Sequence, residues 1–169
     1  MNDAGSVTQS EWECRLKNVL PLFGHRNWIV VADAAYPAQS REGIETIATV
    51  AGQIHVLRTV IDGIAASAHI RANVFLDLEL DFVSEPNAPG IVNYRHELKT
   101  ILSESKVFKL PHEQIIHKLD QSAQVFRVLI LKTKLTIPYT SVFLELDCGY
   151  WSADAEARLR AAIESAAAN

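Results

Sequence analysis

The most distinctive hydrophobic pattern in the chain is a short, continuous apolar run with a proton-transfer group just beyond each end. The run spans residues 28–32, His25 precedes it, and Asp33 follows it directly. A continuous run of this length between turn residues is typical of a strand that is buried on both faces. We therefore expect a buried strand here, with a histidine outside its first end and a carboxylate outside its second.

Helical and extended patterns alternate along the rest of the chain. Residues 11–22 and 53–68 carry apolar side chains three and four positions apart, which predicts amphipathic helices. Residues 73–82 alternate apolar and acidic side chains, which predicts a strand with one face in water. The remaining expected elements are helices at 94–103, 112–121 and 154–168, strands at 106–110, 125–131 and 142–146, and loops at 34–42 and 84–90.

This alternation of strands and helices predicts the α/β class, with three layers (α/β/α) around a mixed, mostly parallel sheet. A length of 169 residues fits one domain and allows a sizeable core. We expect a single domain over residues 1–169, with a short mobile segment at 1–10 made of small and polar residues. Ser152 is in position to cap the final helix at 154–168.

Composition and charge narrow the class of protein. Hydrophobic residues make up 49% and charged residues 21%, as in an ordinary globular protein. A net charge of −4 argues against a nucleic-acid or anionic-membrane partner, because such proteins concentrate basic residues on one face. The sequence holds no apolar span of about 18 residues and no secretory signal at residues 1–6, and Cys14 and Cys148 stand apart. A cytoplasmic protein with two reduced thiols is the resulting expectation.

Several familiar sites are missing from the sequence. There is no GxGxxG or GxxxxGKS loop for a dinucleotide or a phosphate, and no GxSxG nucleophile elbow. The six histidines form neither an HxH nor an HExxH pair, so we expect no metal site. What remains is a dispersed set of proton-transfer groups, namely His25, Asp33, His112 and Tyr139.

Three of these groups lie where an α/β fold can use them. Asp33 follows a strand, and ligands gather at the carboxyl ends of strands in such sheets. His112 begins a helix, and Tyr139 follows Pro138 in the loop before the last strand. Each also has a plain structural interpretation: a capping carboxylate for Asp33, a packed turn for the Pro-Tyr pair, and a solvated or capping side chain for a histidine such as His25.

Four short motifs occur in the order, and with roughly the spacing, of a known family. They are Gly24-His25 with Val31–Ala34 and Pro37, the continuation Tyr36–Ser40, His112–Gln114, and Pro138–Leu144. Over residues 15–150 the chain thus resembles the D-ribose pyranase and L-fucose mutarotase (RbsD/FucU) family of sugar mutarotases. Tyr36–Ser40 is similar to the fucose branch of this family, and His112–Gln114 to the ribose branch.

The resemblance implies an RbsD-like fold and a cofactor-free isomerase that interconverts ring forms or anomers of a ribose- or fucose-like monosaccharide. In this chemistry a base removes the proton of the anomeric hydroxyl and an acid protonates the ring oxygen, so that the hemiacetal opens; closure reverses the two roles. Carried over to this chain, His25 and Tyr139 would be catalytic, with His25 as the principal proton donor. Asp33, His112, Tyr139 and Ser141 would bind the sugar.

The separation of His25 and Asp33 constrains how such a site can be built. Eight residues span up to ~26 Å when extended at about 3.3 Å per residue, which is too far for one monosaccharide to bridge. Either the chain folds back at one end of the strand, or the two groups belong to sites assembled across subunits. The resemblance implies ring-like oligomers with sites near subunit contacts, so we expect a homo-oligomer, with a decamer among the assemblies it allows.

Two departures from the family pattern keep an alternative function open. Ser141 stands where the family has an asparagine, and Lys132–Lys134 replaces a turn that carries a glutamate there. Both favour a non-catalytic monosaccharide-binding or regulatory protein on the same fold, and a purely structural oligomer with a degenerate pocket is a third reading. The helix at 154–168 and the polar N-terminal segment are additions relative to the short family members.

Overall fold

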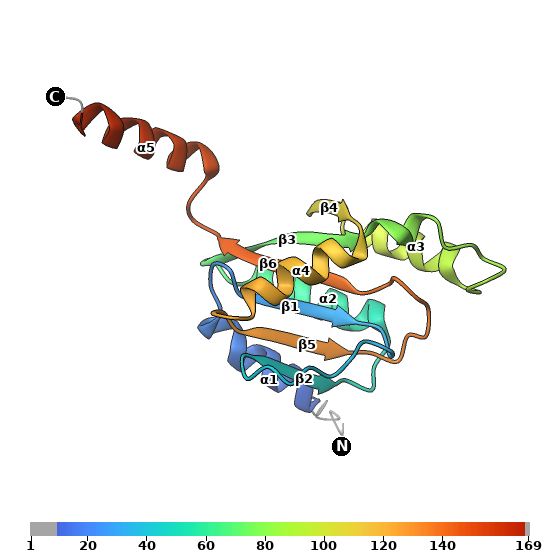
Figure 1. Ribbon diagram of the computed structural model, residues 1–169. Helices are drawn as coiled ribbons and strands as arrows, with labels where there is room; N and C mark the ends of the chain where they lie inside the picture. Colours follow the sequence, from blue (N-terminus) through green and yellow to red (C-terminus); the bar gives the residue numbers. More distant parts are fainter. Residues whose placement is uncertain (1–9, 168–169) are drawn as a thin grey trace, which may run out of the picture.

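The computed structural model describes residues 10–167, which form a six-stranded sheet with helices on both faces (Figure 1). Residues 1–9, which make up most of the segment expected to be mobile, lie outside the described residues, as do residues 168–169. No helix between residues 10 and 167 is long and apolar enough to cross a membrane. The layers confirm the α/β/α class predicted from the sequence.

Helices and strands alternate along most of the chain. The helices are α1 (Glu11–Val19), α2 (Gln53–Ala65), α3 (Ile91–Ile101), α4 (His112–Ser122) and α5 (Ala153–Ala167), with the short 3₁₀ helices η1 (Leu20–Leu22) and η2 (Leu78–Asp81). The strands are β1 (Trp28–Ala32), β2 (Ile44–Ala48), β3 (Ile70–Asp77), β4 (Lys106–Leu110), β5 (Val128–Lys132) and β6 (Val142–Cys148).

The strand order of the sheet is β2-β5-β1-β6-β3-β4, which places β1 in the interior. β6 runs antiparallel to its neighbours β1 and β3, and the other adjacent strands are parallel. In this register Val30 of β1 lies opposite Ile130 of β5 and Phe143 of β6. Because β6 is reversed, its first residues lie at the same edge of the sheet as the last residues of β1 and β3. We call this edge the carboxyl edge and the opposite one the amino edge.

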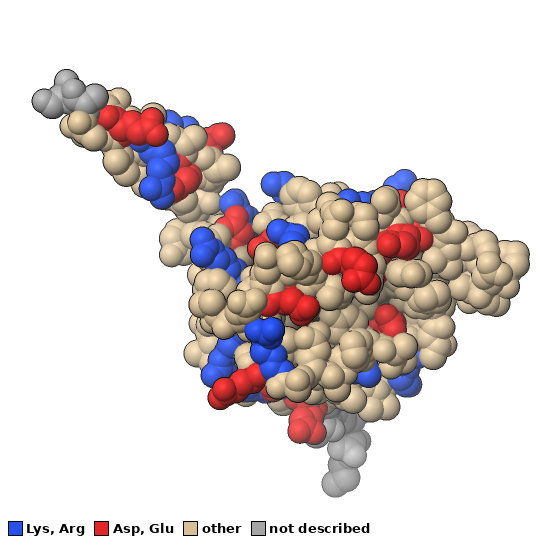
Figure 2. Space-filling view, in the orientation of Figure 1, with Lys and Arg blue, Asp and Glu red and all other residues tan. Residues whose placement is uncertain are grey.

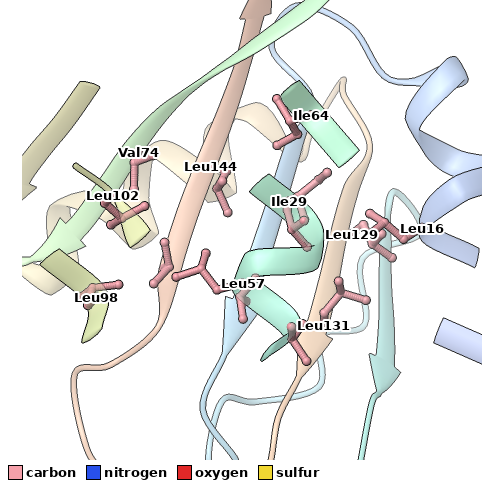
Figure 3. Close-up of a cluster of buried hydrophobic side chains, with 14 of the residues drawn as sticks. Leu16, Ile29, Leu57, Ile64, Val74, Leu98, Leu102, Leu129, Leu131 and Leu144 are labelled. Carbon is pink, nitrogen blue, oxygen red and sulfur yellow. The ribbon is translucent and has the colours of Figure 1, made fainter. Parts of the chain in front are cut away.

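All five side chains of β1 are inaccessible to solvent, which confirms the buried strand predicted at residues 28–32. Successive side chains point to opposite faces of the sheet and so enter two different cores. Ile29 and Val31 pack in the core that α1, α2 and α3 cover, where Figure 3 shows Ile29 beside Leu57 of α2. Trp28 and Val30 enter the core beneath α4. Burial on both faces explains why the run contains no polar residue.

The strand expected at residues 73–82 is wrong at both ends, because β3 covers Ile70–Asp77 and residues 78–81 form η2. The ladder between β3 and β4 ends where Asp77 lies opposite Leu110. The next residue of β4 would be Pro111, which has no N–H to extend the ladder, and the chain turns there into α4. The acidic residues therefore do not line one solvated strand face, and Asp77 is only 1% exposed.

Among the other element boundaries that differ from the expected ones, two have clear local reasons. α3 begins three residues earlier than expected, because the carboxylate of Glu85 accepts hydrogen bonds from the N–H groups of Gly90 and Val92 at its first turn. β5 begins three residues later than expected, because the N–H groups of Val125 and Phe126 instead bond back to the end of α4. Both differences come from hydrogen bonds that hydrophobic periodicity does not reveal.

The last helix, α5, projects away from the sheet and buries none of its side chains (Figure 1). Ser152 caps this helix as predicted, since its Oγ accepts a hydrogen bond from the N–H of Ala155 at 3.1 Å. Residue 168, the last of the predicted helix, lies outside the described residues. The helix is thus a distinct feature at the end of the chain, and it contributes nothing to the two cores.

Candidate functional site

A cavity of about 400 Å³ opens at the carboxyl edge of the sheet. Its volume lies within the range of small-ligand sites. The wall comes from four parts of the chain: the loop after β1, the end of β3, the first turns of α4, and the loop before β6. The lining side chains that carry polar groups are Asp33, Tyr36, Gln39, Asp77, His112, Glu113 and Tyr139.

The topology explains why these residues meet. Asp33 follows β1 and Asp77 ends β3, and both strands run in the same direction because each is antiparallel to β6. Ser141 directly precedes β6, whose reversed direction brings it to the same edge. His112 begins α4 after β4, which is parallel to β3. Residues that are distant in sequence are therefore gathered by the sheet alone.

Asp33 is held at the cavity by bonds to both of its carboxylate oxygens. Oδ2 accepts a hydrogen bond from Ser141 Oγ at 2.9 Å, and Oδ1 accepts one from the N–H of Ala35 at 2.9 Å. The N–H of Asp33 in turn donates to Ser141 Oγ at 3.1 Å. Each carboxylate oxygen keeps a further acceptor site. Asp33 is thus fixed in position and still able to bind a ligand hydroxyl.

His112 is fixed at the first turn of α4 by two acidic residues. Its Nδ1 lies 3.0 Å from Asp77 Oδ2, and its backbone N–H donates to both carboxylate oxygens of Glu79 at 3.1 and 3.0 Å. A carboxylate at this place also complements the positive end of the helix. The His112 side chain remains 31% exposed, on the cavity side.

Tyr139 stands over the imidazole in a strained backbone conformation. Its φ is +57°, a left-handed conformation that non-glycine residues seldom adopt. Its ring lies edge-on to that of His112, with 5.8 Å between the ring centroids, and its side chain is 41% exposed. Strain of this kind is kept only where the surroundings fix the backbone.

A buried polar network fixes the loop that carries Tyr139. The carbonyl of Thr140 accepts hydrogen bonds from the phenol of Tyr94 at 2.6 Å and from the amide of Gln53. Gln53 also donates to the Tyr94 oxygen at 3.0 Å and accepts from the Thr133 hydroxyl at 2.8 Å. Burial raises the pKa of Tyr94, so its phenol stays protonated as a donor. α2 and α3 thereby hold the residue that lies between Tyr139 and Ser141.

Asp77 is the least solvated charged group of the cavity. Burial raises the pKa of its carboxyl, and the adjacent His112 opposes this shift without cancelling it. Among residues 10–167, its Oδ1 has no hydrogen-bond partner. The cavity therefore contains a buried carboxyl that the protein itself satisfies only on one side.

His25, by contrast, lies at the amino edge of the same sheet. Its Nδ1 is 2.9 Å from Asp147 Oδ1 near the end of β6, and its side chain is 58% exposed. Its neighbour Arg26 bonds through its N–H to the carbonyl of Leu146 in β6. β1 alone, at about 3.3 Å per residue, separates the two edges by roughly 16 Å. The chain does not fold back, so within one chain His25 does not reach the cavity.

The structure thus brings together four of the five residues predicted for the site. Asp33, His112, Tyr139 and Ser141 meet at the carboxyl edge, and His25 does not. Asp77 and Glu79 are missing from the predicted set. The signal that could have found Asp77 is its position at the end of a strand, where the same rule that selected Asp33 applies.

Other parts of the described chain offer less to a ligand. A hollow of about 480 Å³ lies near the amino edge, but its Arg15 and Glu45 already pair with one another at 2.7 Å. Among residues 10–167, no cluster of three or more His, Cys, Asp or Glu side chains is placed to hold a metal ion. Basic and acidic side chains are interspersed on the face that α4 covers, as Figure 2 shows. The cavity at the carboxyl edge is therefore the strongest candidate site.

Comparison with known proteins finds one matching family and several similar folds. The sequence profile of the RbsD / FucU transport protein family matches residues 13–148. None of the curated proteins matches the chain. The chain is similar to RbsD from Bacillus subtilis complexed with D-ribose, with 19% identity and a TM-score of 0.54 over 87% of this chain and 98% of that one. It is also similar to FucU from Bifidobacterium longum, with 15% identity and a TM-score of 0.50 over 79% of this chain and 94% of that one.

At these identities the structural likeness concerns the fold, and it confirms the RbsD-like architecture expected from the sequence motifs. The family match covers the whole sheet, from within α1 to the end of β6, and α5 lies beyond it. The chain therefore belongs to the RbsD / FucU transport protein family, as a divergent member.

Proposed function

We propose that this protein interconverts ring forms or anomers of a monosaccharide, as a mutarotase or pyranase that needs no cofactor. The observation that carries the proposal is the cavity at the carboxyl edge, where the imidazole of His112 meets phenol and carboxylate side chains in a chain of this family. RbsD from Bacillus subtilis, on the same fold, is complexed with D-ribose. D-ribose or a related reducing sugar, such as L-fucose, is the substrate class that we propose.

Ring opening requires two proton transfers within one cavity. A base takes the proton of the anomeric hydroxyl while the bond from C1 to the ring oxygen breaks, and an acid gives a proton to the ring oxygen. Asp33, fixed by Ser141, is positioned to hold a sugar hydroxyl during these steps. His112 binds a further hydroxyl, and the exposed phenol of Tyr139 supplies a hydrogen bond or a proton.

The family resemblance names His25 as the proton donor, but His25 lies at the amino edge of the sheet, away from the cavity of its own chain. We propose that a second copy of the chain brings its His25 to the cavity, so that the site is completed between copies. A homo-oligomer follows from this arrangement, and a decamer is one closed ring that provides it. We further propose a cytoplasmic location, in keeping with two cysteines that form no disulfide with one another.

One observation favours a second candidate function, a non-catalytic sugar-binding or regulatory protein. Ser141 replaces an amide of the family pattern with a single hydroxyl, and this hydroxyl is fully engaged with Asp33 as both donor and acceptor. A cavity that binds sugar but lacks one of the two proton-transfer groups would hold the ring without opening it.

Saturation-difference NMR separates the two functions. One anomer of D-ribose, L-fucose or a similar sugar is irradiated, and transfer to the other form is compared with and without the protein. The proposal predicts faster exchange for at least one sugar, since each well-placed acid or base contributes about 10²–10⁴-fold. Asp81→Asn is a matched control that should retain the acceleration, because Asp81 pairs with Lys109 outside the cavity. If one sugar binds but none exchanges faster, the protein is a binder and the mutarotase proposal fails.

A further inference from the structure

Asp77 is a buried carboxyl of the cavity to which the chemistry above gives no task. It ends β3 and is 1% exposed, and its Oδ2 lies 3.0 Å from His112 Nδ1. Within residues 10–167, its Oδ1 has no hydrogen-bond partner. A buried polar oxygen without a partner is costly, and buried polar groups in proteins are nearly always satisfied. Oδ1 is also closed to solvent, so within the described residues Asp77 acts through the contact between its Oδ2 and His112.

We infer that Asp77 is a positioning residue for His112: it holds the imidazole proton on Nδ1 and leaves Nε2 free to accept a proton from the sugar. This inference rests on the proposed function and deepens it, because it assigns the accepting atom of the site.

The first step of the argument is the tautomer of His112. A neutral imidazole carries one proton, and an ionised carboxylate can only accept a hydrogen bond. The 3.0 Å contact with Asp77 therefore places the proton on Nδ1 and leaves Nε2 as an acceptor. In the described part of the chain no hydrogen bond engages Nε2, and His112 lines the cavity.

The second step is that the ring cannot easily turn away from Asp77. The Glu79 carboxylate fixes the backbone N–H of His112. The rings of Tyr139 and Phe143 lie edge-on to the imidazole, at centroid distances of 5.8 and 6.5 Å. With the backbone and the ring plane both held, the identity of residue 77 decides which ring nitrogen faces the sugar.

The third step is the proton balance of ring opening. The anomeric O–H proton moves to Nε2, the bond between C1 and the ring oxygen breaks, and C1 becomes a carbonyl carbon with its former hydroxyl oxygen. The ring oxygen takes a proton from the acid of the site, so that the sugar has lost one proton and gained one. The resulting imidazolium lies against the Asp77 carboxylate, and closure returns both protons.

The charge of Asp77 favours this sequence of events. Burial raises the pKa of Asp77, and the nearby positive charge of a protonated His112 lowers it. The carboxylate is therefore stabilised most once the imidazole has accepted the proton. An interaction that strengthens as the reaction proceeds lowers the barrier, whereas one that is equal throughout does not.

The test compares the wild type with Asp77→Asn by ¹⁵N NMR of the His112 ring, without sugar and at neutral pH. The wild type should carry its ring proton on Nδ1, and the variant should move protons to Nε2, because an amide can donate to Nδ1. The matched control is Asp81→Asn, which removes an exposed carboxylate that pairs with Lys109 of β4. Its His112 ring should resemble that of the wild type. With the sugar that exchanges, Asp77→Asn should lose about 10²-fold or more of the exchange rate at saturating sugar and should bind the sugar more weakly.

The outcomes separate this inference from the proposed function. A wild-type proton on Nε2, or the same tautomer in Asp77→Asn as in the wild type, overturns the role of Asp77 whether or not the protein is a mutarotase. The wild-type measurement needs no variant, so it stands even if Asp77→Asn does not fold. An unchanged exchange rate in a folded Asp77→Asn also overturns the inference. The expected tautomers in a protein that accelerates no exchange would support the positioning role and refute only the mutarotase.

Discussion

Two histidine–aspartate pairs at opposite edges of the same sheet share one geometry but differ in their surroundings. At the carboxyl edge, Nδ1 of His112 lies 3.0 Å from Asp77; at the amino edge, Nδ1 of His25 lies 2.9 Å from Asp147. The side chain of Asp77 is 1% exposed and lines a cavity, whereas that of Asp147 is 26% exposed. The distance within a pair therefore does not show which edge of the sheet forms the cavity.

The difference lies in what else satisfies each carboxylate. Asp147 also accepts hydrogen bonds from Arg71 and from the N–H of Cys148, whereas Oδ1 of Asp77 has no partner among residues 10–167. Burial raises the pKa of Asp147, but these hydrogen bonds outweigh it and leave the pKa lowered. The pKa of Asp77 is raised. The protein pairs both carboxylate oxygens of Asp147, whereas within the described residues it pairs only Oδ2 of Asp77.

The largest expected effect comes from removing either histidine. His112→Ala and His25→Ala should each lose about 10²–10⁴-fold of the sugar exchange rate, because each is proposed to act directly on the sugar. Mixing the two inactive variants and allowing the copies to reassemble should restore part of the activity, since a cavity from one copy can then meet His25 from another. Exchange by saturation-difference NMR measures both. Full activity in His25→Ala would show that the amino edge has no part in the reaction.

A smaller effect is expected on the free energy of unfolding, and it should differ between variants at the carboxyl edge and at the amino edge. Gln53→Ala removes the amide that binds the Thr140 carbonyl and the Thr133 hydroxyl behind the cavity, and leaving such buried groups unpaired costs about 1–3 kcal/mol. Arg71→Ala removes an exposed ion pair with Asp147 and should cost about 0–1 kcal/mol. Urea denaturation of both variants gives the two free energies of unfolding. Equal costs would contradict the description of the carboxyl edge as the buried, preorganised one.

The smallest expected effect is a difference between Asp77→Asn and Asp147→Asn in how the free energy of unfolding depends on pH. Because the folded pKa of Asp77 is raised above its ordinary value of 3.8, its ionisation makes the wild type less stable as the pH rises through that window. Asp147 has a lowered folded pKa, so it stabilises the wild type above 3.8 and loses this contribution as the pH falls through the folded pKa.

Relative to the wild type, Asp77→Asn should therefore gain stability with rising pH, and Asp147→Asn should lose it. Urea denaturation at a series of pH values from acid to neutral measures both trends. Trends of the same sign would mean that the two carboxyls do not differ in the way their surroundings indicate.

The hydrophobic pattern is sufficient to predict the α/β class and the approximate positions of most helices and strands. Residues 28–32 and 106–110 form strands with the predicted bounds. The first is a continuous apolar run because it is buried on both faces, and the second ends where Pro111 cannot extend the ladder. The prediction of one half-solvated strand at residues 73–82 is wrong because the acidic residues have individual partners. Asp77 contacts His112, Glu79 caps α4, and Asp81 pairs with Lys109. Such contacts join residues about 30 positions apart, and no local pattern encodes them.

From the sequence, only those site residues can be predicted that follow a strand or belong to a family motif. Asp33, His112, Tyr139 and Ser141 were named because they follow a strand or match a motif, and the sheet brings them together. Asp77 was assigned to a solvated face, since alternation cannot show that a strand ends at the position in question. His25 is named by its motif, and its eight-residue separation from Asp33 leaves open whether the chain folds back or a second copy supplies the histidine. The structure shows that the chain does not fold back.

The central claim is that the sugar binds at the carboxyl edge, and the most direct test is the response of individual histidines to sugar. The ring signals of His112 are followed by NMR during titration with a sugar whose exchange the protein accelerates. His69 is the internal control, because its Nε2 is held by the carbonyls of Leu20 and Phe23 away from the cavity. The account predicts that the His112 signals shift with the sugar and those of His69 do not. Accelerated exchange with unmoved His112 signals would contradict it.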